Sequence, residues 1–233
     1  MHIGKRVNEF SMLEDQRYIL GRIFNIACDV KADAVLAAGD LYDRSVPLGE
    51  AVSLLDDFIT ALSEKGIAVC AVSGNHDSPE RLDFGSRIMG ARGVHIAGTF
   101  KGRMEKVTFT DSYGEVYVYL LPFIKPAAAE PFFGAEKTGS YFDAVSAAVG
   151  ASGIDTSKRN VLVAHQFVTS SGEEPLRCDS ETVSVGGVDN VDVSAFSPFD
   201  YAALGHLHGA QSIGRSTVRY SGSPLKYSFS EAH

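Results

Sequence analysis

Two continuously apolar runs, AVLAAG (34–39) and IAVCAV (67–72), constrain the fold of this chain more than any other feature. Short runs without a polar face are typical of strands that are covered on both sides in a parallel sheet. Between them, apolar residues recur at helical spacing, namely Leu54, Leu55, Phe58, Ile59 and Leu62. This strand, helix, strand order predicts a layered α/β fold.

Helix signals flank both runs. Ser11 and Glu14 are spaced as a capping-box pair. The apolar residues that then recur at helical spacing are Ile19, Leu20, Ile23, Ile26, Ala27 and Val30. After the second run, Ser78 and Pro79 supply an N-cap and a first-turn proline, which predict a third helix.

The second half of the chain is richer in strand patterns. KVTFT (106–110) and EVYVYLL (115–121) alternate on either side of turn residues, which predicts a hairpin. The further expected elements are a helix near 140–149, strands at 160–167 and 201–208, and a pair of strands flanking GRST (214–217). We therefore expect two facing mixed β-sheets flanked by helices.

Composition narrows the class of protein. The 233 residues are 45% hydrophobic, enough for one domain with a sizeable core, and this excludes a disordered chain. No apolar run is long enough to cross a membrane.

Cys28, Cys70 and Cys178 lack metal-ligand spacing and are interpreted as reduced core residues, which favours a cytoplasmic location. A net charge of −8 argues against a surface coated in DNA-binding basic residues, although metal-ligating acids contribute to that charge.

Metal-capable side chains follow the expected strands. The residues are Asp40, Asn75, His76, Asp77, His165, His206 and His208. Each has a structural alternative: Gly-Asp is a common turn, GNHDSP could be a turn and a helix cap, and a lone His165 could be a core histidine. His206 and His208 are two residues apart on an expected strand, so both should point the same way.

Taken together, these side chains favour a metal site. Five of them, Asp40, Asn75, His165, His206 and His208, supply one carboxylate, one amide oxygen and three imidazoles. This set suits divalent manganese, iron or zinc, and the absence of a thiolate argues against structural zinc. A carboxylate between two sets of ligands is the arrangement of two-metal phosphoester hydrolysis. His76 is then a candidate general acid or phosphate-binding residue, because imidazole can donate a proton near neutral pH.

The order of these motifs resembles the calcineurin-like metallophosphoesterase superfamily, with GD, GNHD, a histidine and GHLH in sequence. Finer patterns are similar to one branch, the SbcD-type DNA exonuclease subunits. The segments that carry this resemblance are HIGKRVNEFSM, GDLYDRSVP, SGNHDSPERL, VLVAHQFV, DYAALGHLH and RYSGSPLKYSFSE.

The resemblance implies a set of roles. One metal ion would be held by Asp40, Asn75, His165 and His206, and a second by His2, Asp40 and His208. His76 matches the family's catalytic histidine. The resemblance further implies two Mn²⁺ ions, a homodimer within a heterotetramer, and an SbcC-type coiled-coil ATPase partner. The complex would cut double-stranded DNA ends and hairpins in repair, recombination and replication.

The chain departs from the family pattern at both ends. The family's first strand, with an aspartate two residues before His2, and the region beyond YSFSE are absent from the sequence. We therefore expect a single metallophosphoesterase domain, 1–233, truncated at both ends, and impaired as a nuclease in this form.

Two other functions fit the same residues. A phosphoesterase acting on phosphoproteins or small phosphodiesters would share every metal ligand, and a scaffold that does not cut DNA is the second alternative. Four basic residues near the motifs could contact DNA phosphates or be ordinary surface, and they are Lys5, Arg6, Arg44 and Arg81.

Overall fold

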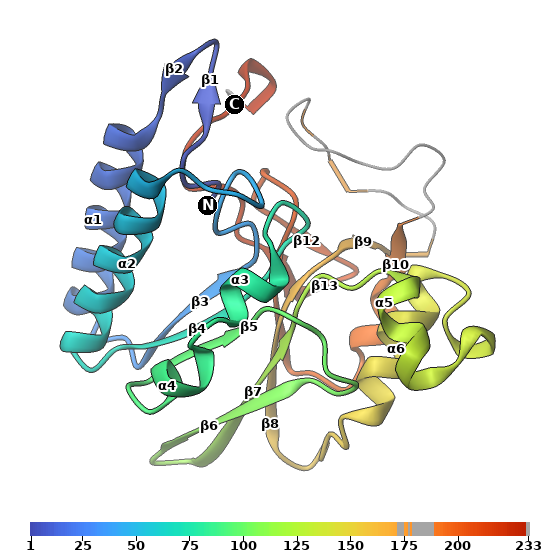
Figure 1. Cartoon of the computed structure of the whole chain (residues 1–233). Helices are drawn as coiled ribbons and strands as arrows, with labels where there is room; N and C mark the ends of the chain where they lie inside the picture. Colours follow the sequence, from blue (N-terminus) through green and yellow to red (C-terminus); the bar gives the residue numbers. More distant parts are fainter. Residues whose placement is uncertain (172–174, 177, 179–188, 232–233) are drawn as a thin grey trace.

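The computed structural model describes residues 1–171, 175–176, 178 and 189–231, and it shows two β-sheets that face each other (Figure 1). The smaller sheet is parallel, in the order β3 (Ala34–Ala38), β4 (Ala68–Val72), β5 (Val94–Ala97). The larger sheet is mixed, in the order β12-β13-β11-β8-β7-β6. This confirms the predicted α/β class with facing sheets.

The larger sheet has parallel strands in its centre and antiparallel strands at its edges. Its strands are β6 (Glu105–Asp111), β7 (Gly114–Leu121), β8 (Arg159–His165), β11 (Tyr201–Gly205), β12 (Gln211–Ile213) and β13 (Arg215–Tyr220). Two small ribbons complete the strands: β1 (Arg6–Val7) with β2 (Phe10–Ser11), and β9 (Phe167–Thr169) with β10 (Asn190–Asp192).

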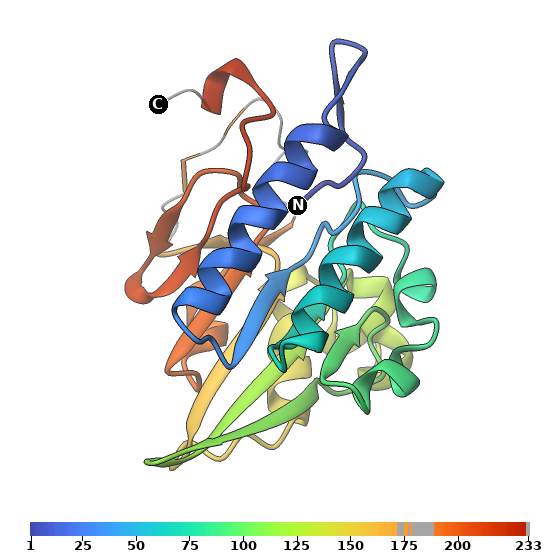
Figure 2. The same cartoon turned by 90° about the vertical axis from the view of Figure 1, so that its left-hand side faces the viewer.

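Helices cover the outer faces of both sheets. α1 (Leu13–Asp29) and α2 (Gly49–Glu64) lie side by side in front of β3 in Figure 2. The helices α5 (Pro126–Phe133) and α6 (Tyr141–Ala151) pack with the larger sheet, in one apolar cluster that includes Ala129 and Leu162. The remaining helices are short: α3 (Pro79–Asp83), α4 (Ser86–Gly90), η1 (Ala135–Lys137), η2 (Val193–Phe196) and η3 (Phe229–Glu231).

A separate apolar layer fills the space between the sheets. Its buried members are Cys70, Val72, Ala97, Val107, Val118, Leu120 and Val163. Each strand of the smaller sheet contributes apolar side chains to the cores on both of its faces, which explains why these runs lack a polar side. Because the packed strands run parallel, the ends of β3, β4, β8 and β11 meet at one edge of the molecule.

Some local predictions need correction. Met12, not Ser11, is the N-cap of α1, and the Met12 side chain makes no capping hydrogen bond. Ser11 belongs to β2, and its Oγ accepts a hydrogen bond from the backbone N of Leu13 at 3.4 Å. Pairing with β1 has therefore displaced the expected capping box. The hairpin near GRST turns at Gly214, so Arg215 already lies in β13.

Strand β3 is an edge strand of the smaller sheet. It pairs with β4, and in the described part of the chain no strand lies on its other side. Beyond the end of β3, an isolated parallel bridge pairs Ile3 with Tyr42. Across the residues that the structure covers, no helix combines the length and apolar character needed to cross a membrane.

The two sheets approach each other closely at Gly205, at the end of β11. A Cβ atom there would lie 1.7 Å from the backbone oxygen of Ala38 and 2.8 Å from Nδ1 of His165. We expect Gly205→Ala to lower the free energy of unfolding by about 3 kcal/mol, the upper end of overpacking costs, because backbone must move. Denaturant unfolding measures this change.

Gly21→Ala is the matched control, because Gly21 lies in α1 and a Cβ atom there meets nothing within 4 Å. It should raise the free energy of unfolding by about 0.5–1 kcal/mol through helix propensity. Equal effects of the two substitutions would contradict a close approach of β11 to β3.

Candidate metal centre

Asp40 lies at the centre of the site, two residues beyond the end of β3. Gly39 and Asp40 have φ angles of 82° and 48°, so the chain turns sharply as it leaves the sheet. The Asp40 side chain is buried, with the residue 4% exposed. Gly74 leaves room for it, because a Cβ atom at position 74 would lie 2.1 Å from Oδ1 of Asp40. The turn and the glycine together place a carboxylate inside the protein.

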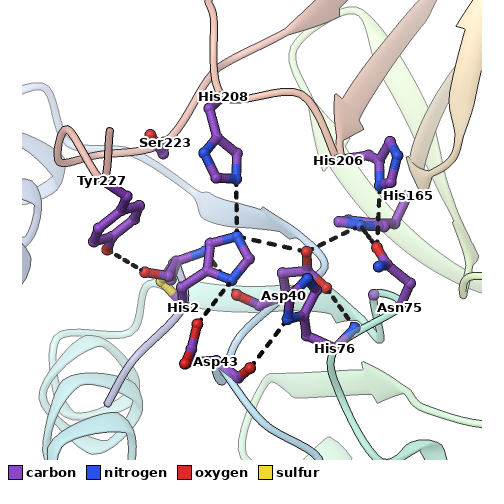
Figure 3. Close-up of polar contacts among 12 residues, drawn as sticks. His2, Asp40, Asp43, Asn75, His76, His165, His206, His208, Ser223 and Tyr227 are labelled. Atoms are coloured by element: carbon purple, nitrogen blue, oxygen red, sulfur yellow. Dashed lines mark hydrogen bonds and ion pairs between the residues drawn. The ribbon is translucent and has the colours of Figure 1, made fainter. Parts of the chain in front are cut away.

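The two oxygens of Asp40 have different neighbours (Figure 3). Oδ1 accepts a hydrogen bond from the backbone N of His76 at 3.0 Å. Oδ2 lies 3.3 Å from Nε2 of His165 and 3.6 Å from Nε2 of His2. One carboxylate oxygen therefore lies between two histidines that come from different parts of the chain.

On one side of Asp40 is the Asn75 group, which we define as Asp40, Asn75, His165 and His206. Oδ1 of Asn75 lies 3.0 Å from Nε2 of His165 and 3.0 Å from Nδ1 of His206. The other ring nitrogen of His165 is 2.8 Å from the carbonyl of Ala38, to which it can donate. Nε2 then faces Asn75 and Asp40. Burial works to lower the pKa of His165, but the charge of Asp40 and a hydrogen bond to Asp40 raise it, so a metal ion at Nε2 would have to displace a proton.

On the other side is the His2 group, which we define as His2, Asp40 and His208. Nε2 of His2 and Nε2 of His208 face each other at 3.0 Å. Backbone bonds from His2 N to Asp40 O and from Ile3 N to Leu41 O hold the start of the chain against the turn after β3.

Side chains from distant parts of the sequence also hold this segment. Nε2 of Gln16 donates to the carbonyl of His2 at 2.7 Å, and Oε1 of Gln16 accepts from Gly4 N at 2.9 Å. The hydroxyl of Tyr227 donates to the carbonyl of Met1 at 2.6 Å and accepts from Gln16 at 3.1 Å. The carbonyl groups of Met1 and His2, before and after the His2 side chain, are thus both held by side chains.

The prediction that His206 and His208 point the same way from a strand was wrong. Strand β11 ends at Gly205, and His206 has a φ of 102°, outside the extended region. The alternation of side chains in a strand does not apply beyond that point. As a result His206 faces Asn75, whereas His208 faces His2.

The donor atoms fit divalent metal ions. Metal–nitrogen and metal–oxygen bonds of about 2.0–2.2 Å put neighbouring ligand atoms about 3 Å apart, which matches the separations in both groups. Among the described residues, Nε2 of His206 has no hydrogen-bond partner although it is buried. Two ring nitrogens facing each other at 3.0 Å also need a proton or a cation between them. Three residues, His2, Asp40 and His76, form another possible set of ligands. One possible ligand atom of each lies within 4.8 Å of the other two.

Burial and neighbouring charges set the protonation of the candidate ligands. Burial lowers the pKa of His2 to about 2 and that of His206 to about 3, so both rings are neutral at pH 7 and can bind a cation. Burial works to raise the pKa of Asp40, but the charge of His165 and the hydrogen bond from His165 hold it well below its usual value. The carboxylate is therefore ionised.

His76 differs from the other histidines in its contacts. Its Nδ1 is 3.0 Å from the backbone carbonyl of Asp43, and its ring meets the ring of His2 edge-on at a centroid distance of 4.9 Å. It is only partly buried. When Nδ1 donates to Asp43, Nε2 is the ring atom that can act on a substrate.

Several residues that organise the site were not among the predicted site residues, although Asp77 is one of the metal-capable side chains that follow the expected strands. Asp77 accepts hydrogen bonds from the backbone N of Leu41, Tyr42 and Gly74 at 2.8–3.0 Å, and so ties the Asp40 turn to the loop that carries Asn75. Its place in the GNHD motif was the available signal. Gln16, Tyr227 and Glu231 carried no motif of their own beyond the YSGSPLKYSFSE segment.

The four basic residues lie differently relative to the site. Nζ of Lys5 is 3.0 Å from Oδ1 of Asp43, and Nε of Arg44 is 3.7 Å from Oδ2 of the same carboxylate, with the Arg44 side chain 73% exposed. Arg6 is exposed and donates to the carbonyl of Glu9, and Arg81 is exposed on α3. Lys5 and Arg44 thus lie beside the loop that contacts His76.

A cavity of about 290 Å³ borders both ligand groups. Its polar end includes His2, Asp40, His165, His206 and His208. Its apolar part follows residues 35–38 of β3 and is lined from the helices by Ile23, Leu55, Phe58 and Ile59.

Comparison with known proteins gives consistent matches. Residues 1–210 match the model of the family described as calcineurin-like phosphoesterase. The chain is 36% identical over 239 aligned positions to the SbcD component of the SbcCD nuclease of Staphylococcus epidermidis, covering 100% of this chain and 61% of that protein. It is 35% identical over 234 positions to the corresponding SbcCD nuclease component of Staphylococcus saprophyticus, covering 99% and 60%. The chain therefore spans about three fifths of the length of these relatives.

Proposed function

The chain belongs to the calcineurin-like phosphoesterase family, and we propose that it is the nuclease domain of an SbcD-type protein that cuts double-stranded DNA with two Mn²⁺ ions. The observation that carries this proposal is the position of Asp40 Oδ2, between Nε2 of His165 and Nε2 of His2. A carboxylate oxygen so placed can bridge two cations.

Each ligand group would hold one ion. The Asn75 group offers four protein ligands, and the His2 group offers three. Two ions bound there would activate a water molecule and neutralise charge on the phosphate oxygens. Neutral His2 and His206 and ionised Asp40 are the protonation states that such ions require.

His76 would act on the substrate. The hydrogen bond from its Nδ1 to Asp43 orients the ring, and its Nε2 can then contact the phosphate or donate a proton to the leaving oxygen. Asp43 also pairs with Lys5, which links the proposed catalytic histidine to a basic residue that DNA phosphates could approach. Arg44, and farther along the surface Arg6 and Arg81, would add phosphate contacts.

The name of the relatives describes one component of an SbcCD nuclease, which supports the proposal of a partner protein. We propose an SbcC-type coiled-coil ATPase as partner, a homodimer within a heterotetramer, and a cytoplasmic role in DNA repair, recombination and replication. Ends and hairpins of double-stranded DNA would be its substrates.

An additional aspartate directly before Met1 would complete the His2 group. The family resemblance implies an aspartate at that position. The parallel bridge between Ile3 and Tyr42 supports a register in which a segment joined to Met1 would run beside β3, along the apolar part of the cavity. Such a segment would also convert the α-amino group of Met1, which lies 2.7 Å from the carbonyl of Asp40, into an uncharged amide. We call a protein with this segment, ending in aspartate, the extended chain.

The test compares both forms on DNA. With Mn²⁺, the extended chain should degrade linear duplex DNA, and the 233-residue chain should be slower by about 10²-fold, the cost of misplaced ligands. DNA binding should weaken as salt rises, because phosphate contacts release counterions. Gel assays of end-labelled duplex measure both.

Other outcomes would favour the alternatives. Hydrolysis of phosphoproteins or small phosphodiesters without DNA cleavage in the extended chain would favour another phosphoesterase. Two bound metal ions without hydrolysis of any phosphoester would favour a scaffold. Either result overturns the proposed nuclease function.

A further inference from the structure

Glu231 is a buried carboxylate near the end of the described chain, and the family motifs assign it nothing. It lies in η3 and is 4% exposed. Its Oε1 is 3.0 Å from Nδ1 of His208, while its Oε2 accepts hydrogen bonds from Tyr227 N at 3.0 Å and from Oγ of Ser223 at 3.4 Å. One buried acid thus joins a loop histidine to the segment that follows β13.

The contact determines which nitrogen of His208 can bind a metal ion. A carboxylate is an acceptor, so the proton of a neutral His208 ring lies on Nδ1. The lone pair then lies on Nε2, which is the atom 3.0 Å from His2 (Figure 3). A carboxylate that accepts from the far nitrogen also makes a histidine ligand more basic and fixes its ring orientation.

We propose that Glu231 is a positioning residue for His208, which it holds in the tautomer and orientation that the second metal ion requires. This inference rests on the proposed two-metal function. The Asn75 group differs in this respect, because His165 has the neutral carbonyl of Ala38 in the equivalent place. Glu231 therefore acts on one of the two ion sites.

The same segment holds the other histidine of the His2 group. Tyr227, whose backbone N donates to Glu231, donates its hydroxyl hydrogen to the carbonyl of Met1, next to His2. Lys226 also donates to the backbone carbonyl of Glu231. Tyr227 and Glu231 thus hold the two ligands that face each other at 3.0 Å. The segment makes the His2 group dependent on a distant part of the sequence.

The first experiment measures Mn²⁺ affinity in the extended chain. Titration followed by electron paramagnetic resonance counts free Mn²⁺ and resolves two classes of site. Glu231→Ala should weaken Mn²⁺ binding at the His2 group by about 10–100-fold, the usual cost of losing a ligand's carboxylate partner. Mn²⁺ binding at the Asn75 group should stay unchanged. Glu231→Gln should fall between the two, because the amide oxygen can still accept from Nδ1 but carries no charge. Phe229→Ala, an exposed residue of the same η3 turn, is the matched control and should bind as the unmodified protein does.

A second measurement needs no metal ion. In ¹⁵N-histidine NMR spectra of the metal-free protein, His208 should show a proton on Nδ1, and Glu231→Ala should abolish that preference. Unfolding curves recorded alongside separate a loss of stability from a loss of positioning.

The outcomes distinguish this inference from the proposed function. Fewer than two Mn²⁺ ions in the unmodified extended chain would refute the two-metal function, while the NMR spectra would still test the contact. Two ions bound equally well in Glu231→Ala, equal weakening of both classes, or a proton on Nε2 of His208 would overturn the positioning role.

Discussion

Asp40→Asn should abolish tight binding of both metal ions and nearly all phosphodiesterase activity in the extended chain. The change removes one charge while keeping the size of the side chain, and asparagine tolerates the φ of 48° at this position. The carboxylate oxygen between His165 and His2 would become a neutral group that bridges two cations poorly. Metal affinity should fall by more than the roughly 10–100-fold that loss of a ligand's hydrogen-bond partner costs. Turnover should fall by about 10²–10³-fold, as when one charge-stabilising group is removed.

Metal analysis after gel filtration and hydrolysis of a generic phosphodiester measure the two effects together. Asp57→Asn is the matched control, because that side chain is 67% exposed on α2 and pairs with the exposed Arg17. It should leave metal content and turnover unchanged. If Asp40→Asn kept two ions, Asp40 would not be a bridge.

The buried strands could be predicted from sequence because they are apolar on both faces. Residues 34–38 and 68–72 contribute to the outer core and to the layer between the sheets, so no polar position interrupts them. Residues Val94–Ala97 form a strand that sequence patterning did not separate from its surroundings, since four residues carry too little periodicity. The β1–β2 ribbon is shorter still, and its pairing displaced the expected cap of α1.

The candidate ligands could be selected because each follows a strand, and parallel strands end at one edge of a sheet. The orientation of each side chain could not be derived in this way. His206 left the extended conformation one residue after β11, so a rule for strands gave a wrong direction.

The contacts that hold the His2 group in place could not be predicted from local sequence patterns. Gln16 meets Tyr227 across 211 residues of sequence, and Glu231 meets His208 across 23. Neither pair has a spacing that periodicity could reveal, since tertiary packing alone brings the partners together. The YSGSPLKYSFSE segment was noticed for its resemblance, and the structure gives it a physical role in holding the His2 group.

His76→Ala should separate catalysis from metal binding. The backbone N of His76, not its ring, donates to Oδ1 of Asp40, and an alanine keeps that bond. The position of the bridging carboxylate should therefore survive, and both ions should remain. The lost ring is the proposed proton donor or phosphate contact, so turnover should fall by about 10²–10⁴-fold, the range for general acid–base groups.

The competing role for His76 is that of a ligand, because one of its ring nitrogens lies within 4.8 Å of possible ligand atoms of His2 and Asp40. Metal content measured beside phosphodiester hydrolysis decides between the two roles. His95→Ala, at a partly buried histidine of β5, controls for the loss of an imidazole elsewhere and should change neither quantity. His76→Asn adds a finer comparison, because its amide can still donate to the carbonyl of Asp43 but cannot transfer a proton. Full metal content with little turnover in both His76 variants is the expected result, and metal loss equal to that of Asp40→Asn would make His76 a ligand.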